Sequence, residues 1–173
     1  MLDACEPAHL KAKSHLEKAE YLSKQVQADP SLISAKVLNL RNNCTVEDVI
    51  RRAGEYVEFA TDRFERLFND SKFRDSFGFG RDQARTFASA LSQVIEIELR
   101  SADGHSEYRQ VSMHQLVEMR NQNRNISELY EGMTPVKFEI VQMSISQLGS
   151  IIVNHVSNRV NEAGGLDNVH DIN

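Results

Sequence analysis

Residues 45–69 read TVEDVIRRAGEYVEFATDRFERLFN, and this stretch decides how the rest of the chain has to be arranged. Its apolar residues recur at steps of three and four, which is typical of one apolar stripe along a helix. Thr45 can cap the first turn, and Asp48 can complete a capping box. The sequence therefore predicts a long central helix. Its apolar stripe consists of Val46, Ile50, Ala53, Val57, Ala60, Phe64 and Leu67.

Four further stretches are predicted to be helices that cover this one. They are residues 7–28, 31–41, 81–95 and 134–163. The last of them has the strongest signals, with Thr134 as its cap and Pro135 at its first position. Gly164 follows its end.

Residues 94–113 allow two interpretations. Ile95, Ile97 and Leu99 alternate with polar residues, which is typical of a strand, and Gly104 suits a hairpin turn. Two helices that meet at Gly104 account for the same residues, and few β-branched residues follow the turn. We therefore expect helices here, with a short β-hairpin at 94–113 as the alternative.

The whole pattern predicts a mainly α fold, a helical bundle of five to six helices. The bundle is expected to form a single domain over residues 1–165, followed by a disordered tail at 166–173. Gly54 lies inside the central helix, where glycine costs about 1 kcal/mol relative to alanine. We expect this glycine to allow close packing against another helix.

The composition is that of an acidic globular protein. The chain has 173 residues, a formal net charge of −5 and 40% hydrophobic residues, enough for a core without metals or disulfides. No segment is strongly basic, so nucleic-acid binding is not favoured. No apolar run reaches the length of a membrane span, and Cys5 and Cys44 are expected to be free thiols. These features predict a cytoplasmic protein that does not bind a membrane.

No motif for a metal ion, a nucleotide or another cofactor stands out. Glu6 and His9 match half of the two-metal motif of helical bundles, but the second half is missing. Cys5 and His9 have the spacing of two ligands on one helix face, yet no partner pair follows. Gly78 and Gly80 lack the third glycine of a phosphate-binding loop. We therefore predict neither a metal site nor a cofactor.

One pair of residues carries an enzymatic alternative. The spacing of Arg109 and His114 resembles the Arg-x(4–6)-His motif that HEPN-type ribonucleases carry in a helix. The resemblance implies a metal-independent RNase in which Arg109 stabilises phosphate charge and His114 acts as acid or base. Such a site requires both residues on one helix or on its capping turn.

A DNA-binding regulator is the second alternative. Residues 45–54 resemble the first helix and the turn of a helix-turn-helix motif, which makes 56–68 the recognition helix. That segment carries Glu58, Asp62 and Glu65 against two arginines, so its net charge is negative and DNA phosphates would repel it. The apolar stripe also continues without a phase break, which favours one continuous helix.

The function that these observations favour is that of a non-enzymatic interaction or regulatory protein. We expect it to act through contacts with another protein, and to form a homodimer. The homodimer is expected because the last predicted helix has an apolar face too wide for a single neighbour. The predicted interface residues are Phe138, Ile145, Ile152 and Val156.

Overall fold

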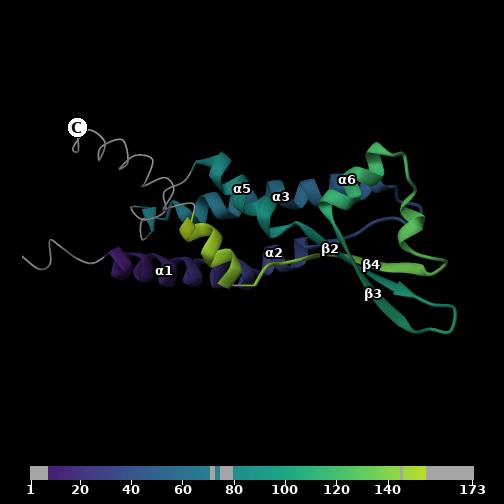
Figure 1. Ribbon diagram of the computed structural model, residues 1–173, viewed down its shortest axis with the longest axis horizontal. Coiled ribbons are helices and arrows are strands. Elements are labelled where there is room, and N and C mark those ends of the chain that lie inside the picture. Colours follow the sequence, from purple (N-terminus) through teal and green to yellow (C-terminus); the bar gives the residue numbers. More distant parts are fainter. Residues whose placement is uncertain (1–7, 71–72, 75–79, 145, 155–173) are drawn as a thin grey trace, which may run out of the picture.

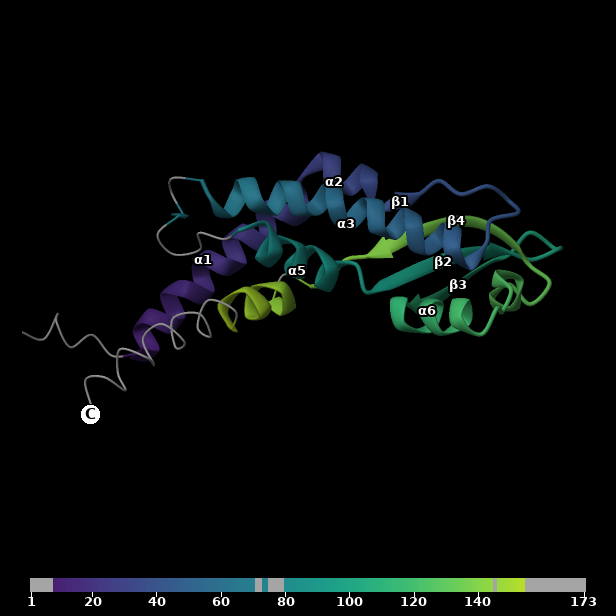
Figure 2. The same cartoon turned by 90° about the horizontal axis from the view of Figure 1, so that it is seen from above.

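The computed structural model of the chain describes residues 8–70, 73–74, 80–144 and 146–154. Its helices are α1 (Ala8–Ala28), α2 (Pro30–Ala35), α3 (Val46–Phe68), α5 (Arg81–Leu91), α6 (Met113–Asn121), the short 3-10 helix η2 (Ile126–Leu129) and a last helix over 146–154. The strands are β1 (Val37–Leu38), β2 (Val94–Arg100), β3 (Ser106–Ser112) and β4 (Thr134–Val141). Figures 1 and 2 show an elongated molecule with helices at one end and a sheet at the other.

The central helix that the sequence predicts is α3. The Thr45 hydroxyl accepts a hydrogen bond from the Asp48 N–H, and the Asp48 carboxylate accepts one from the Thr45 N–H, which completes the capping box. The first half of α3 lies over the sheet and the second half runs through the helical end (Figures 1 and 2). This one helix therefore contributes to both parts of the core.

The buried face of α3 is rotated from the predicted stripe. Phe64 is fully buried, as expected, whereas Val57 is only half-buried. Tyr56 and Phe68 are buried instead, and Phe68 packs edge to face against Phe87 of α5 with ring centroids 5.4 Å apart. Aromatic side chains fill the helical end and thereby select which residues of α3 point inward.

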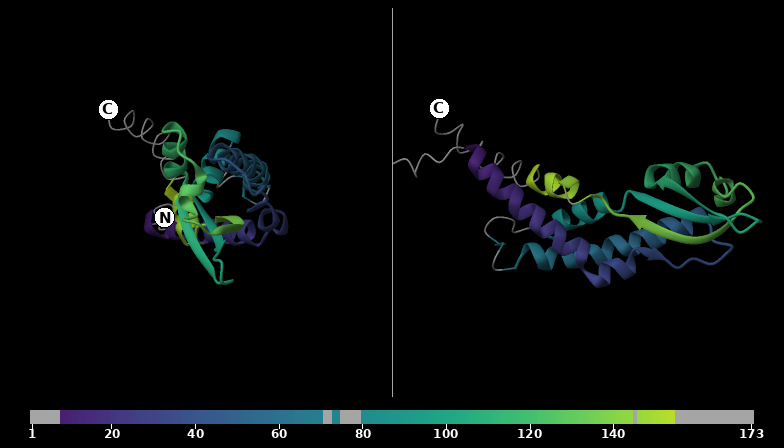
Figure 3. Two further views of the ribbon diagram at one scale, coloured as in Figure 1. Left: turned by 90° about the vertical axis from the view of Figure 1, so that its right-hand side faces the viewer. Right: turned by 90° about the horizontal axis from the view of Figure 1, so that it is seen from below.

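The expectation of a mainly α bundle is wrong, because the chain contains a four-stranded antiparallel sheet with the order β1-β4-β2-β3. The protein is an α+β fold. In Figure 3, α3 and α6 lie on the same side of the sheet. Antiparallel sheets commonly have one covered face and one face in water.

Residues 94–113 form the β2–β3 hairpin rather than two helices. Ile95, Ile97 and Leu99 point to the covered face and are buried, as the alternation along β2 indicates. Gly104 has a φ of +92° in the turn, a conformation that suits glycine. The second arm has few β-branched residues because β3 is an edge strand and most of its side chains are exposed.

The predicted helix over 134–163 is also wrong in its first part, which is strand β4. Phe138 and Ile140 are buried and face the core, and they alternate with the half-buried Glu139 and Val141. Between Glu98 and Leu99 of β2 the register shifts by one residue, and this bulge lies beside Pro135. Bulges accept proline because a missing N–H does not interrupt the ladder there. The Thr-Pro pair that resembles a helix start therefore begins a strand.

The predicted helix over 31–41 is shorter than expected. Asp29 accepts a hydrogen bond from the Ser31 N–H and caps α2, which ends at Ala35. The chain then extends into β1, where Leu38 pairs with Phe138 of β4. The apolar residues of 31–41 therefore belong partly to the short helix α2 and partly to the edge strand β1.

Candidate functional site

Arg109 and His114 do not form the site that the RNase alternative requires. Arg109 lies on β3, where its guanidinium donates to the Leu129 carbonyl and to the Glu131 carboxylate, both at 3.0 Å. His114 lies on α6, is exposed, and is 3.2 Å from the Glu118 carboxylate. The two residues belong to different elements and bind different partners, so this alternative has no structural basis in the described residues.

The helix-turn-helix alternative also fails on geometry. Residues 46–68 form one continuous helix, so the proposed turn after Gly54 does not exist. Gly54 is exposed, and a Cβ added there would meet no atom within 4 Å. The close packing expected at this glycine is therefore wrong as well.

The predicted interface residues do not share one helix. Phe138 is buried on β4 and Ile152 is buried on the last helix, so packing within the chain already accounts for both. Ile145 and Val156 lie outside the described residues. The one long helix with two apolar faces from which a homodimer is expected does not exist, because residues 134–141 form a strand and a helix covers 146–154. Self-association itself stays a prediction.

The open edge of the sheet is strand β3, which among the described strands pairs with β2 alone. Hydrogen bonds from Ser101 N–H to the His105 carbonyl and from Met113 N–H to the Gln93 carbonyl mark the two ends of this ladder. Hydrogen-bonded pairs alternate along an antiparallel ladder. The backbone groups that face away from β2 are therefore those of Ser106, Tyr108 and Gln110.

The Tyr108 side chain projects from the uncovered face of the sheet beside this edge. It is 61% exposed, the largest value among the large apolar residues that are exposed in the described chain. It lies opposite Glu98 on β2, and Lys137 of β4 lies on the other side of Glu98. An exposed aromatic side chain next to unpaired backbone groups is the arrangement of a surface that accepts a strand.

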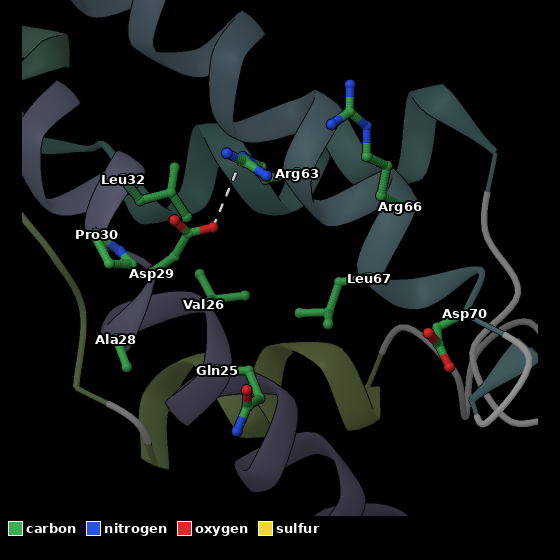
Figure 4. A pocket seen from close by; sticks show the side chains of 10 residues that line it. All are labelled: Gln25, Val26, Ala28, Asp29, Pro30, Leu32, Arg63, Arg66, Leu67 and Asp70. Carbon is green, nitrogen blue, oxygen red and sulfur yellow. Dashed lines mark ion pairs between the residues drawn. The ribbon is translucent and has the colours of Figure 1, made fainter.

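A groove lies between the end of α1, the start of α2 and the second half of α3 (Figure 4). Val26 and Leu67 point toward each other inside it, and Arg66 extends away from them. At one end the Arg63 guanidinium lies 3.7 Å from the Asp29 carboxylate.

Two polar groups that line this groove, Asp29 and Arg63, stabilise the fold. The Asp29 carboxylate caps α2, and hydrogen bonds from Ser31 hold its pKa below the usual range. Arg63 also donates to the Ser31 hydroxyl at 2.7 Å. These contacts fasten α2 to α3, so we assign the groove a structural role.

A second hollow region surrounds the loop between β1 and α3. Cys44 lines it and is buried, with its sulfur 3.7 Å from the Tyr130 hydroxyl. Burial raises the pKa of the Cys44 thiol and that of the Tyr130 phenol. A thiol that resists ionisation is a poor nucleophile, so this cysteine has the environment of a core residue. Cys44 is a free thiol, and Cys5 lies outside the described residues.

Within the described part of the chain, no three side chains of His, Cys, Asp or Glu are grouped so that they could hold a metal ion. None of its helices is both long enough and apolar enough to cross a membrane. No family model, no curated protein and no solved structure matches this chain. The candidate site therefore rests on the geometry of the β3 edge.

The sequence reasoning named Arg109 within this strand but missed the strand edge itself. The signal was present in the alternation of Ile95, Ile97 and Leu99, followed by a turn and a polar arm. If both segments around that turn are strands, the polar one is expected at the edge of the sheet, because a central strand of a covered sheet carries more apolar residues.

Proposed function

We propose that this chain is a non-enzymatic interaction protein that binds another polypeptide by strand addition at β3. The observation that carries the proposal is the unpaired edge over Ser106–Ser112, with the exposed Tyr108 at its centre. Proteins normally blunt such edges with bulges, prolines, charged side chains or very short strands. The β2–β3 ladder is regular and β3 contains no proline, and its two charged residues, Glu107 and Arg109, form an ion pair with each other at 3.6 Å.

Strand addition provides affinity through main-chain hydrogen bonds and specificity through alternate side chains. Both components are available at this edge, because the backbone groups of Ser106, Tyr108 and Gln110 face outward. A regulatory role follows naturally from such binding, and the cytoplasmic location expected from the sequence stays a prediction.

A photoreactive amino acid at position 108 tests the proposal in the native cell. The matched control carries the same amino acid at Ile33, which is 43% exposed and lies on α2, outside the sheet. We expect a covalent adduct with a specific polypeptide from position 108 and none from position 33. Equal adducts from both positions, or none from position 108, would refute binding at this edge.

Self-association is the second part of the function that we propose. Its support is the exposed apolar side chain of Val136 on β4, which β2 separates from the β3 edge. Sedimentation equilibrium measures it directly, since one chain has a mass of 19.6 kDa. A mass of one chain at every concentration would remove the homodimer and leave binding to other proteins.

A further inference from the structure

The surroundings of the β3 edge indicate which kind of polypeptide fits it. We propose that β3 accepts a single extended segment with lysine or arginine at alternate positions, which joins the sheet as an additional strand. This inference rests on the proposed function and names its partner. Four features of the edge support this partner: the direction of the backbone groups, the position of α6, the local charge and the exposed Tyr108.

The backbone groups define the geometry of the incoming segment. Met113 and His105 hydrogen-bond to Gln93 and Ser101, the residues that flank β2, so outward-facing groups occur at every second position between them. These groups belong to Ser106, Tyr108 and Gln110. Ser112 also faces outward, but its N–H already donates to the Gln115 side chain in the capping box of α6. The free part of the edge therefore ends at Gln110.

The position of α6 favours a single extended strand over a second copy of this chain as the occupant of the β3 edge. Helix α6 contacts β3 and lies on the same side of the sheet as α3 (Figure 3). A second copy joined through β3 would have to fit its own α6 beside this one on that side of the sheet, where packed helices need about 8–10 Å between their axes. A single extended segment carries no helix and has no such requirement.

The charge at this edge is complementary to a basic segment. The hairpin and the adjacent loop carry five carboxylates and only two guanidinium groups. The carboxylates are those of Glu96, Glu98, Asp103, Glu107 and Glu131, and the guanidinium groups are those of Arg100 and Arg109. Arg109 is already engaged by Glu131 at 3.0 Å and by Glu107 at 3.6 Å. The same ion pairs engage Glu107 and Glu131, which leaves Glu96, Glu98 and Asp103 against Arg100. Lys137, on the other side of Glu98, is held by Glu139 at 2.9 Å.

Tyr108 adds a second recognition element for cations. Its ring is largely exposed, and Glu98 lies opposite it across the ladder. A lysine or arginine side chain can lie over an aromatic ring while it approaches a neighbouring carboxylate. The incoming strand would place every second side chain on this uncovered face, which explains the alternate spacing of the basic residues.

Amide hydrogen exchange of the full chain, followed by NMR, tests the inference with two synthetic peptides. One blocked octapeptide alternates lysine with threonine, and its matched control alternates glutamate with threonine. The lysine peptide should protect the amides of Ser106, Tyr108 and Gln110 from exchange. The amides of Glu107 and Arg109 already donate to β2 and should not change, so they serve as internal controls.

Two variants separate backbone pairing from side-chain effects. Tyr108→Pro removes the outward N–H and should abolish binding of the lysine peptide, while Tyr108→Phe keeps the N–H and the ring and should retain it. Thermal unfolding of both variants verifies that the fold persists. If Tyr108→Pro does not fold, the protection pattern in the wild-type chain still decides the outcome.

Three results would overturn the inference. Equal binding of the glutamate peptide would refute the charge assignment, and binding without protection at the three outward amides would refute strand addition. Protection that grows with protein concentration, together with a doubled mass, would identify a second copy as the occupant. An adduct from position 108 to an acidic extended segment would refute the basic strand and leave the proposed function intact, whereas an adduct to a helical segment would refute both.

Discussion

The hydroxyl of Tyr130 lies 3.7 Å from the sulfur of Cys44, although 86 positions separate the two residues in the sequence. Both side chains are buried, and the contact connects the start of α3 with the turn that precedes β4. Tyr130 also packs against Phe138, with ring centroids 6.3 Å apart. This corner therefore joins the helical layer to the sheet with one polar contact inside an apolar setting.

We expect Cys44 to react slowly with iodoacetamide in the folded chain and quickly in urea. Burial raises the pKa of its thiol, and the thiolate is the reactive form. The measurement is the alkylation rate by mass spectrometry, in a Cys5→Ser background so that one thiol is followed. Equal rates in buffer and in urea would contradict the burial of this side chain.

The same pKa shift predicts how stability depends on pH. The folded chain keeps the Cys44 proton to a higher pH than the unfolded chain does. The stabilising contribution is therefore complete below the pKa of an unfolded cysteine, about 8.5, and decreases as the pH rises from there through the folded value. Urea unfolding above this pH should show a weaker decline in Cys44→Ala than in the wild-type chain.

Gly54→Ala should stabilise the protein by about 0.5–1 kcal/mol. Gly54 lies inside α3, is exposed, and has open space where a Cβ would be. Alanine restricts the unfolded chain and introduces no clash. The urea midpoint should rise with an unchanged slope, and a lower midpoint would show that this part of α3 needs glycine.

Phe64→Ala should lower the free energy of unfolding by about 3–5 kcal/mol. Phe64 is 0% exposed, and its ring stacks on that of Phe68 with centroids 5.6 Å apart. Val57→Ala is the matched control on the same helix. Because Val57 is only half-buried, its truncation should lower the free energy of unfolding much less. Similar losses for both variants would show that the buried face of α3 is assigned incorrectly.

Proline substitutions along β3 should show an alternation in stability. The Glu107 N–H donates to β2, whereas the Tyr108 N–H faces the open edge. Glu107→Pro should therefore destabilise the chain by at least about 1 kcal/mol more than Tyr108→Pro, the value of one ladder hydrogen bond. Thermal unfolding of the two variants measures the difference in stability. A less stable Tyr108→Pro would show that the Tyr108 N–H, and not the Glu107 N–H, donates to β2.

The sequence predicts those elements whose signals are local. The cap at Thr45 and the spacing of apolar residues after it specify α3 without information from the rest of the fold. The sequence also predicts helix α1 and its end before Pro30, because proline disfavours a helical conformation in the residue before it. Local hydrogen bonds and backbone sterics are sufficient for these features.

The sheet could not be predicted in the same way, because strands depend on partners that are distant in the sequence. Thr134 and Pro135 resemble a helix start, yet they pair with β2, and β1 pairs with the other side of the same strand at Phe138 and Glu139. The edge at β3 depends on strand order, which the sequence alone did not reveal. The outward direction of Tyr108 then follows from the register of a ladder, not from its own residue type.

The 23 residues of α3 have a further consequence for how the chain can be divided. At about 1.5 Å per residue the helix is about 34 Å long, and its two halves belong to different parts of the core. A cut before α3 would separate it from β1, and a cut after it would separate it from Phe87 and from β2 and β4. We therefore expect that neither the helical end nor the sheet would keep its fold if the described chain were divided at α3.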